Sequence, residues 1–261
     1  MTAQVYGGRP APRAAAPRRG MMGALPVRGR HTHVGAPTMP FARRITRFGF
    51  VNGYLVEEPD GLTLIDTMVS GSAPRIRTAA AALGRPIVRI LLTHAHGDHA
   101  GSLDAVHADW PEAEVCISAR DARLLRRDLG TEPGEPPDAR IRGSLPGART
   151  EPARLLEDGD RIGSLEVIAS PGHTPGHVAF LDTRDRALYC GDAYTTFGGV
   201  ATTAHSNWLF PLAVMATWHR STALASARRL RDLDPALLAP GHGRPRERPA
   251  PAMDRAIARG A

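Results

Sequence analysis

The chain has 261 residues and a formal net charge of +7, which at first favours a nucleic-acid partner. Residues 1–40 hold six arginines and no acidic residue, so the other 27 arginines and 26 acids leave the body of the chain at +1. A nearly neutral body lacks a basic surface for following phosphates, and we expect no nucleic-acid partner. No stretch approaches the ~20 apolar residues of a membrane span, so we expect no membrane segment.

Residues 1–40 also differ from the rest in composition, with six prolines, scattered glycines and no hydrophobic period. We predict a disordered Arg/Pro/Ala-rich tail over 1–40 and one folded domain over 41–261. Translation beginning at Met39 is an alternative, and the tail lacks the apolar core of a secretory signal. Cys116 and Cys190 each lie inside an apolar run and read as buried free thiols, which favours the cytoplasm.

From residue 41 onward, short apolar runs alternate with helix patterns and turn signals. We expect strands at 50–56, 62–66, 87–92, 114–118, 154–156, 165–169, 178–181, 187–190 and 236–239, and helices at 73–83, 118–129 and 221–233, with another helix beginning near 100–103. Residues 131–150 have no period, and a loop of this length is usually functional or mobile. The second half repeats the first in outline, which suggests two packed sheets with helices outside.

An apolar run at residues 88–92 leads directly into the sequence T-H-A-H-G-D-H-A. Side chains two apart on an extended backbone point the same way, so His94, His96 and Asp98 can converge. His99 then begins the next segment. Four candidate ligands within six positions favour a metal site over a chance accumulation of polar loop residues.

Three further candidate ligands occur in short glycine-containing pieces. They are His173 in P-G-H-T-P-G-H, Asp192 in C-G-D-A and His242 in P-G-H-G. Together with the first cluster they make five imidazoles and two carboxylates without cysteine, a set that suits zinc or another borderline divalent ion. We therefore expect a two-metal site.

These five motifs, taken in order, resemble those of the metallo-β-lactamase-fold metallo-hydrolase superfamily over about residues 45 to 245. The resemblance implies an α/β fold, an αββα four-layer sandwich of two similar halves. It also implies that one metal is bound by His94, His96 and His173, the other by Asp98, His99 and His242, and that Asp192 bridges the two. By the same resemblance Asp66 supports the ligand loop, whereas His177 has a structural role.

The expected cofactors are two Zn²⁺, with iron or manganese as alternatives. Two cations with Asp98, Asp192 and a bridging hydroxide carry a net +1, which stabilises an oxyanion forming on a carbonyl. Zinc lowers the pKa of bound water to about 7, so the bridging hydroxide is the expected nucleophile. Asp98 is the expected catalytic carboxylate, exchanging a proton as the tetrahedral intermediate collapses. The chain has no G-x-S-x-G serine-hydrolase motif.

The fold alone does not decide the chemistry. Aspartate at position 192 differs from the cysteine or serine typical of true β-lactamases, and His96 replaces the glutamate of diiron flavoproteins. A small-molecule hydrolase of esters, thioesters or lactones remains, similar to glyoxalase II and the acyl-homoserine lactonases. The alternative is a mononuclear iron enzyme similar to the persulfide dioxygenases.

Two features bear on whether the chain is more similar to glyoxalase II or to the lactonases. The chain has no lysine for glutathione carboxylates, although Arg244 or Arg246 would be substitutes. The lactonase catalytic tyrosine lies three residues after the bridging aspartate, whereas Tyr194 lies two after it. Tyr194 is therefore a weak candidate oxyanion donor and equally a packing residue.

An apolar cluster lies between the last two expected ligands, in a chain with only 5% aromatic residues. Its members are Trp208, Leu209, Phe210, Met215 and Trp218. We predict that this cluster forms one wall of the active site and receives an apolar acyl group, with a buried connector as the alternative.

Overall fold

The computed structural model describes residues 7–8, 39–205 and 207–260. Contacts divide the chain into Met1–Ala36 and Pro37–Ala261, and the second unit alone is described below. The predicted tail over 1–40 lies almost wholly outside the described residues and stays a prediction. None of the helices in the described part is long and apolar enough to cross a membrane.

The first sheet has six strands that follow one another in chain order. They are β1 (Ala42–Arg47), β2 (Val51–Glu58), β3 (Gly61–Ile65), β4 (Ile87–Leu91), β5 (Glu114–Ser118) and β6 (Arg154–Leu156). The first three strands pair antiparallel, and β3 to β6 pair parallel. The parallel strands carry their carboxyl ends to one edge, where the histidine-rich loop after β4 begins.

The second sheet also has six strands, in the order β14-β13-β10-β9-β8-β7. Its strands are β7 (Arg161–Ile162), β8 (Leu165–Ala169), β9 (Val178–Asp182), β10 (Ala187–Gly191), β13 (Leu237–Pro240) and β14 (Arg246–Glu247). Only β10 and β13 pair parallel, so both end at the same edge. A separate ribbon joins β11 (Tyr194–Thr195) to β12 (Ala201–Thr202).

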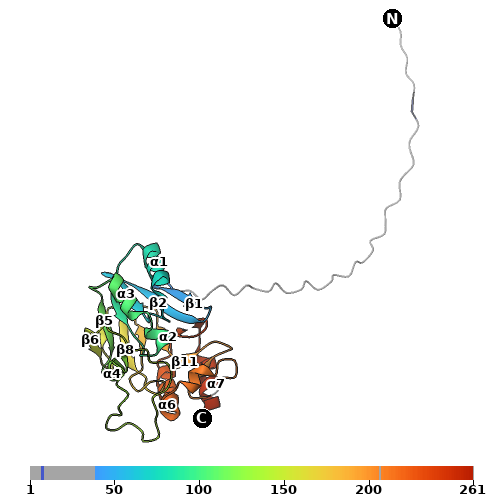
Figure 1. Ribbon diagram of the computed structural model, residues 1–261. Coiled ribbons are helices and arrows are strands. Elements are labelled where there is room, and N and C mark those ends of the chain that lie inside the picture. The colour runs from blue at the N-terminus through green and yellow to red at the C-terminus, as the bar shows by residue number, and fades with distance from the viewer. Residues whose placement is uncertain (1–6, 9–38, 206, 261) are drawn as a thin grey trace. The chain divides into compact units, whose positions relative to one another are not determined.

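Helices cover the outer faces of both sheets, and Figure 1 shows α1 and α6 on opposite sides of them. The helices are α1 (Ala73–Leu83), α2 (Gly97–Ala100), α3 (Leu103–Asp109), α4 (Ala119–Leu125), α5 (Leu212–Met215), α6 (Arg220–Asp232) and α7 (Ala250–Gly260). Three buried apolar clusters lie between the layers. One packs α1, α3 and α4 against the first sheet, the second packs the two sheets together, and the third packs α6 and α7 against the second sheet. The predicted αββα sandwich is confirmed.

Local signals explain several element ends. Helix α1 stops where Gly84 adopts φ +66 and donates its N–H to Ala81, as the glycine predicted. Gly101 lies between α2 and α3, where a Cβ would collide with the carbonyl oxygen of Gly97, so the position requires glycine. The predicted helix over 118–129 is too long: α4 ends at Leu125, and Arg127 turns the chain at φ +61.

The expected strand at 154–156 belongs to the first sheet, where it pairs with β5. At the start of α4, Ser118 Oγ accepts the N–H of Asp121 at 3.2 Å. The Asp121 carboxylate points inward and contacts the ligand loops. The sequence patterns did not predict β1, α7 or the short elements β7, β11, β12, β14 and α5.

Candidate metal centre

The seven predicted ligands come together at the edge where β4, β8, β10 and β13 end. Each sits in the loop that follows one of these strands, so both sheets contribute. We name two sets by their donor atoms, which lie within 4.8 Å of one another in each set. The first donor group is His94, His96 and His173; the second donor group is Asp98, His99 and His242. Asp192 lies between them.

Distances between donor atoms fit the size of a divalent cation. His96 Nδ1 lies 3.0 Å from His173 Nε2, and His242 Nε2 lies 3.2 Å from Asp98 Oδ2. Four ligand atoms around one tetrahedral zinc, with bonds of about 2.0–2.1 Å, lie about 3.3 Å from each other. The observed spacings therefore match a cation-sized gap between the side chains.

The hydrogen bonds of the first donor group fix which nitrogen of each ring carries a proton. His96 Nε2 donates to the Arg142 carbonyl at 2.8 Å, so its Nδ1 keeps a lone pair. His173 Nδ1 lies 3.2 Å from Thr217 Oγ1, whose own proton is committed to a backbone carbonyl. Thr217 therefore accepts from His173, whose Nε2 also keeps a lone pair. Two ring nitrogens 3.0 Å apart need either a proton on one of them or a cation between them.

His94 completes this group in the same way. Its Nδ1 lies 3.0 Å from Thr93 Oγ1, which itself donates to Asp66 at 2.8 Å. The other nitrogen, Nε2, is buried and has no hydrogen-bond partner among the described residues. An unpartnered buried nitrogen aimed at two other lone pairs fits a cation site.

In the second donor group, a carboxylate that is not itself a candidate ligand orients one of the imidazole rings. His99 Nδ1 donates to Asp66 Oδ2 at 2.8 Å, which leaves Nε2 as the donor atom toward Asp192. Asp66 also accepts the N–H of Thr93 at 2.8 Å, so it holds the start of the ligand loop, as predicted. Asp66 has φ +60, a conformation that is uncommon for a residue other than glycine.

Asp192 contacts both donor groups, and its Oδ2 alone reaches a member of each. Its Oδ2 lies 3.5 Å from His173 Nε2 and 3.2 Å from His242 Nε2, and its Oδ1 lies 3.3 Å from His99 Nε2. His177 holds the backbone of Asp192: its Nε2 accepts the Asp192 N–H at 3.1 Å, and its Nδ1 is hydrogen-bonded to the Ser170 hydroxyl at 2.9 Å. Asp192 has the geometry expected of a bridging carboxylate, and His177 has the structural contacts expected of it.

The charges of the two groups differ. Burial lowers the pKa of His94 and of His173 well below the ordinary value, so both rings are neutral. Burial also pulls down the pKa of His242, but the Asp192 and Asp98 carboxylates outweigh it and raise the value to about 9. In the absence of a cation, protons on the second group thus balance the carboxylates, and a cation would replace them.

One support of the site had no sequence signal. Buried Asp121 accepts N–H groups from Ala95 at 2.9 Å and Gly176 at 2.8 Å, and the Thr174 hydroxyl at 2.8 Å. It thereby ties the loop of His94 to the loop of His173. Only the fold brings helix α4 to these two loops.

The long loop over 131–150 is the second support. Besides the Arg142 carbonyl on His96, Ser144 accepts the N–H of Gly97 at 2.8 Å. Gly143 has φ +84, and a Cβ there would lie 2.5 Å from the His96 ring. The loop therefore covers His96 closely and requires glycine at the point of contact.

A cleft of about 760 Å³ leads from the solvent to the donor groups. His96, Asp98, His173, Asp192 and His242 line its floor. Its walls are mainly apolar and include Phe48, Phe50, Val69, Phe210, Leu212 and Met215. No arginine lines it among the described residues, and the chain has no lysine.

Two sequence expectations about this cleft fail. Tyr194 is fully buried, and its hydroxyl donates to the Ala227 carbonyl of α6 at 2.7 Å, on the far side of the second sheet. It is a packing residue and has no access to the cleft as an oxyanion donor. Trp208 is 84% exposed and lines a different hollow. Of the predicted wall, Phe210 and Met215 line the cleft, whereas Trp208, Leu209 and Trp218 do not.

Comparison with known proteins assigns the chain to a family. The family model described as the metallo-beta-lactamase superfamily matches residues 46–242. The chain therefore belongs to the metallo-beta-lactamase superfamily, whose members include metallo-hydrolases. This assignment confirms the family predicted from the five motifs.

Individual relatives refine the picture. The uncharacterized protein YobT of Bacillus subtilis (strain 168) is 46% identical over 208 residues, 79% of this chain and 89% of YobT. The hydroxyacylglutathione hydrolase of Rhodopseudomonas palustris (strain HaA2) is 28% identical over 56% of this chain, and the match spans about half of that enzyme (49%). The crystal structure of TTHA1623 in a di-iron-bound form has a TM-score of 0.60 and 27% identity, covering 81% of this chain and 96% of that one.

Proposed function

We propose that this protein is a two-metal hydrolase that cleaves small esters, thioesters or lactones with an apolar acyl group. The observation that carries the proposal is the cleft, because it joins five of the seven candidate ligands to a wall of apolar side chains. Bound divalent cations would polarise a substrate carbonyl and lower the pKa of water to about 7. Zinc suits the imidazole and carboxylate donors, and iron is supported by the di-iron-bound form of TTHA1623.

We assign the chain's own residues to separate tasks. The first donor group would hold one cation, the second donor group the other, and Asp192 would contact both. Asp98 lines the cleft with 39% of its side chain exposed, and we assign proton transfer to its carboxylate. The covering loop over 131–150 and the apolar wall would exclude water around the reacting carbonyl.

The cleft also bears on the substrate. Glutathione carries two carboxylates, and a site for it needs cationic side chains beside the cleft. None of the described lining residues is an arginine. The similarity to hydroxyacylglutathione hydrolases covers about half of such an enzyme. We therefore favour an apolar acyl compound over a glutathione thioester.

The substrate proposal is tested with a series of thioesters or lactones of increasing acyl length. Each buried methylene adds up to ~0.8 kcal/mol, or about fourfold in kcat/KM, until the cleft is full. Met215→Ser should flatten this rise and leave the shortest substrate unchanged, because Met215 lies in the cleft wall. Leu209→Ser is the matched control, since Leu209 is also partly exposed but does not line the cleft.

A flat series in the wild type, or a preference for phosphodiesters or β-lactams, would count against the acyl proposal. Metal analysis of protein purified without added metal tests the other part. Two cations per chain agree with the proposal, whereas a single iron would favour the persulfide dioxygenase alternative.

A further inference from the structure

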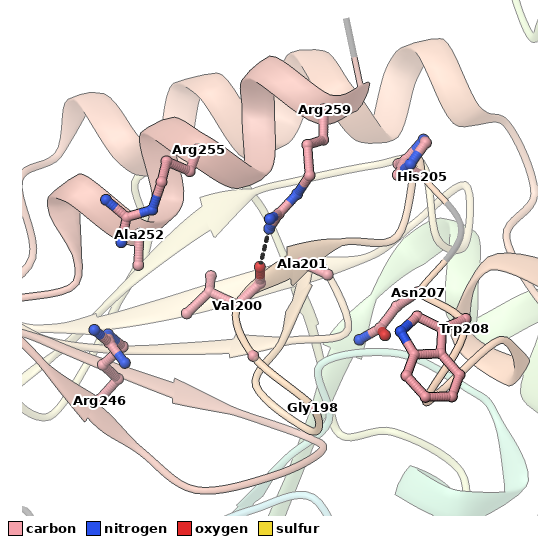
Figure 2. Close-up of a pocket in the computed structure, with 11 residues that line it drawn as sticks. Gly198, Val200, Ala201, His205, Asn207, Trp208, Arg246, Ala252, Arg255 and Arg259 are labelled. Carbon is pink, nitrogen blue, oxygen red and sulfur yellow. Dashed lines mark hydrogen bonds between the residues drawn. The ribbon is translucent and has the colours of Figure 1, made fainter.

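A second hollow, of about 400 Å³, lies between α7 and the segment that follows β11. Figure 2 shows Arg255 and Arg259 reaching from α7 and Arg246 from β14, with Trp208 and Asn207 at the other end. Val200 and Ala252 form part of its lining. None of the seven candidate metal ligands borders it, so the hollow is separate from the metal cleft.

Some arginines of the body pair with carboxylates, as Arg77 does with Asp109 and Arg229 with Asp158, both at 2.7 Å. Among the described residues, no carboxylate forms an ion pair with Arg246, Arg255 or Arg259. Asp254, next to Arg255 on α7, is held instead by Arg231 at 2.7 Å.

The three arginines thus line one hollow without an ion pair of their own to a carboxylate of the described residues. Arg259 donates one hydrogen bond, to the Val200 carbonyl at 2.7 Å, which fixes its direction and leaves its other donors available. Arg255 and Arg259 are four residues apart on one helix face, where like charges repel each other. An anion between them would remove this repulsion. The planar guanidinium fork matches the oxygens of a phosphate group.

The other end of the hollow offers a flat apolar surface. Trp208 is 84% exposed, which is unusual for so large an apolar ring. Local hydrogen bonds hold the turn that presents it: Asn207 Nδ2 donates to Phe197 at 2.9 Å, and Asn207 Oδ1 accepts the Leu209 N–H at 3.1 Å. A flat ring stacked on the indole would cover the exposed surface.

We propose that this hollow binds a phosphate-bearing ligand with a flat ring, of the nucleotide class. The arginines would hold the phosphates and Trp208 would stack on the ring. The volume suits a ligand of this size, since small-molecule pockets measure about 300–1,000 Å³. The proposal is independent of the reaction assigned to the metal cleft.

Calorimetric titration of the metal-loaded protein with ADP and with pyrophosphate tests it. Both should bind saturably at physiological ionic strength. Arg246→Gln/Arg255→Gln should weaken both at least tenfold. Arg220→Gln/Arg228→Gln, which removes the same charge from exposed positions of α6, should leave both affinities unchanged. Trp208→Ala should weaken ADP only, because pyrophosphate has no ring.

Diphosphates can also bind to metal ions, and Asp192→Ala separates that event from the hollow. Binding that survives in Asp192→Ala and falls in Arg246→Gln/Arg255→Gln supports the proposal. No saturable binding, equal losses in both arginine pairs, or binding lost only in Asp192→Ala would overturn it. Pyrophosphate and ADP responding alike to Trp208→Ala would refute the ring-stacking part.

Discussion

The first and second donor groups sit side by side but are built differently. In the first, hydrogen bonds to Thr93, Thr217 and the Arg142 carbonyl set the tautomer of each buried ring. In the second, Asp98 is 39% exposed and His242 Nδ1 has no hydrogen-bond partner among the described residues. The first group is therefore organised before a cation arrives, whereas the second depends more on the cation to order it.

This difference suggests an order of occupancy. Neutral, pre-oriented imidazoles bind a cation without losing protons or side-chain freedom, which favours the first group. The second group must give up the proton that its carboxylates hold on His242. We expect the first group to fill first and to release its cation last.

The largest effect is expected where the two groups meet. Asp192→Ala removes a carboxylate that contacts His173, His99 and His242, so both cations should be lost or bound weakly. Losing the polarising cations removes several kcal/mol of transition-state stabilisation, on the order of 10³-fold in kcat/KM. Metal content by mass spectrometry and hydrolysis rates test this, with circular dichroism confirming the fold. Wild-type activity with one cation per chain would contradict the two-metal proposal.

A smaller and selective effect separates the groups. His242→Ala should leave close to one cation per chain, because the first donor group is untouched. His173→Ala, the matched variant in the first group, should bind less metal than His242→Ala, since the organised site is lost. Metal stoichiometry after dialysis against a weak chelator measures both. Equal stoichiometry in the two variants would refute the predicted order of occupancy.

The smallest effect comes from one hydroxyl outside the ligand set. Thr217→Val keeps the shape but removes the acceptor for His173 Nδ1–H, which should weaken the first cation roughly 10–100-fold. The hydroxyl also donates to the Ala213 carbonyl at 2.8 Å, so stability should fall by about 1–3 kcal/mol. Thr217→Ser should restore the metal affinity. Chelator competition and thermal melts check the two readouts, and an unaltered affinity in Thr217→Val would show that His173 needs no orienting partner.

Local patterns predicted much of the fold because the relevant signals are close in sequence. The helix at 73–83 and the strand at 114–118 appear with the expected bounds. Period-two alternation placed His94 and His96 on one side, and the ligand loops follow strand ends as expected. The helix predicted after Ser118 is too long. Helix-favouring residues continue past Leu125, but the chain turns at Arg127, which has a positive φ.

Tyr194 is a packing residue and not an oxyanion donor for a local geometric reason. Tyr194 lies two residues after Asp192, and on a continuous strand both side chains would face the cleft. Gly191 has φ +47, and Ala193 donates its N–H to Cys190 at 3.0 Å. This tight turn puts the side chains of Asp192 and Tyr194 on opposite sides of the chain. Asp192 therefore faces the donor groups, and Tyr194 packs against α6.

The sequence by itself determined the family, the αββα layers and the seven residues that converge, because strand periods and short motifs are read from neighbouring residues. The tertiary structure alone decided which ring nitrogens face the gap and that Asp121 ties two ligand loops together. It also decided that Trp208 borders the arginine-lined hollow while Phe210 borders the cleft. These outcomes depend on segments far apart in the chain, whose packing no local pattern specifies.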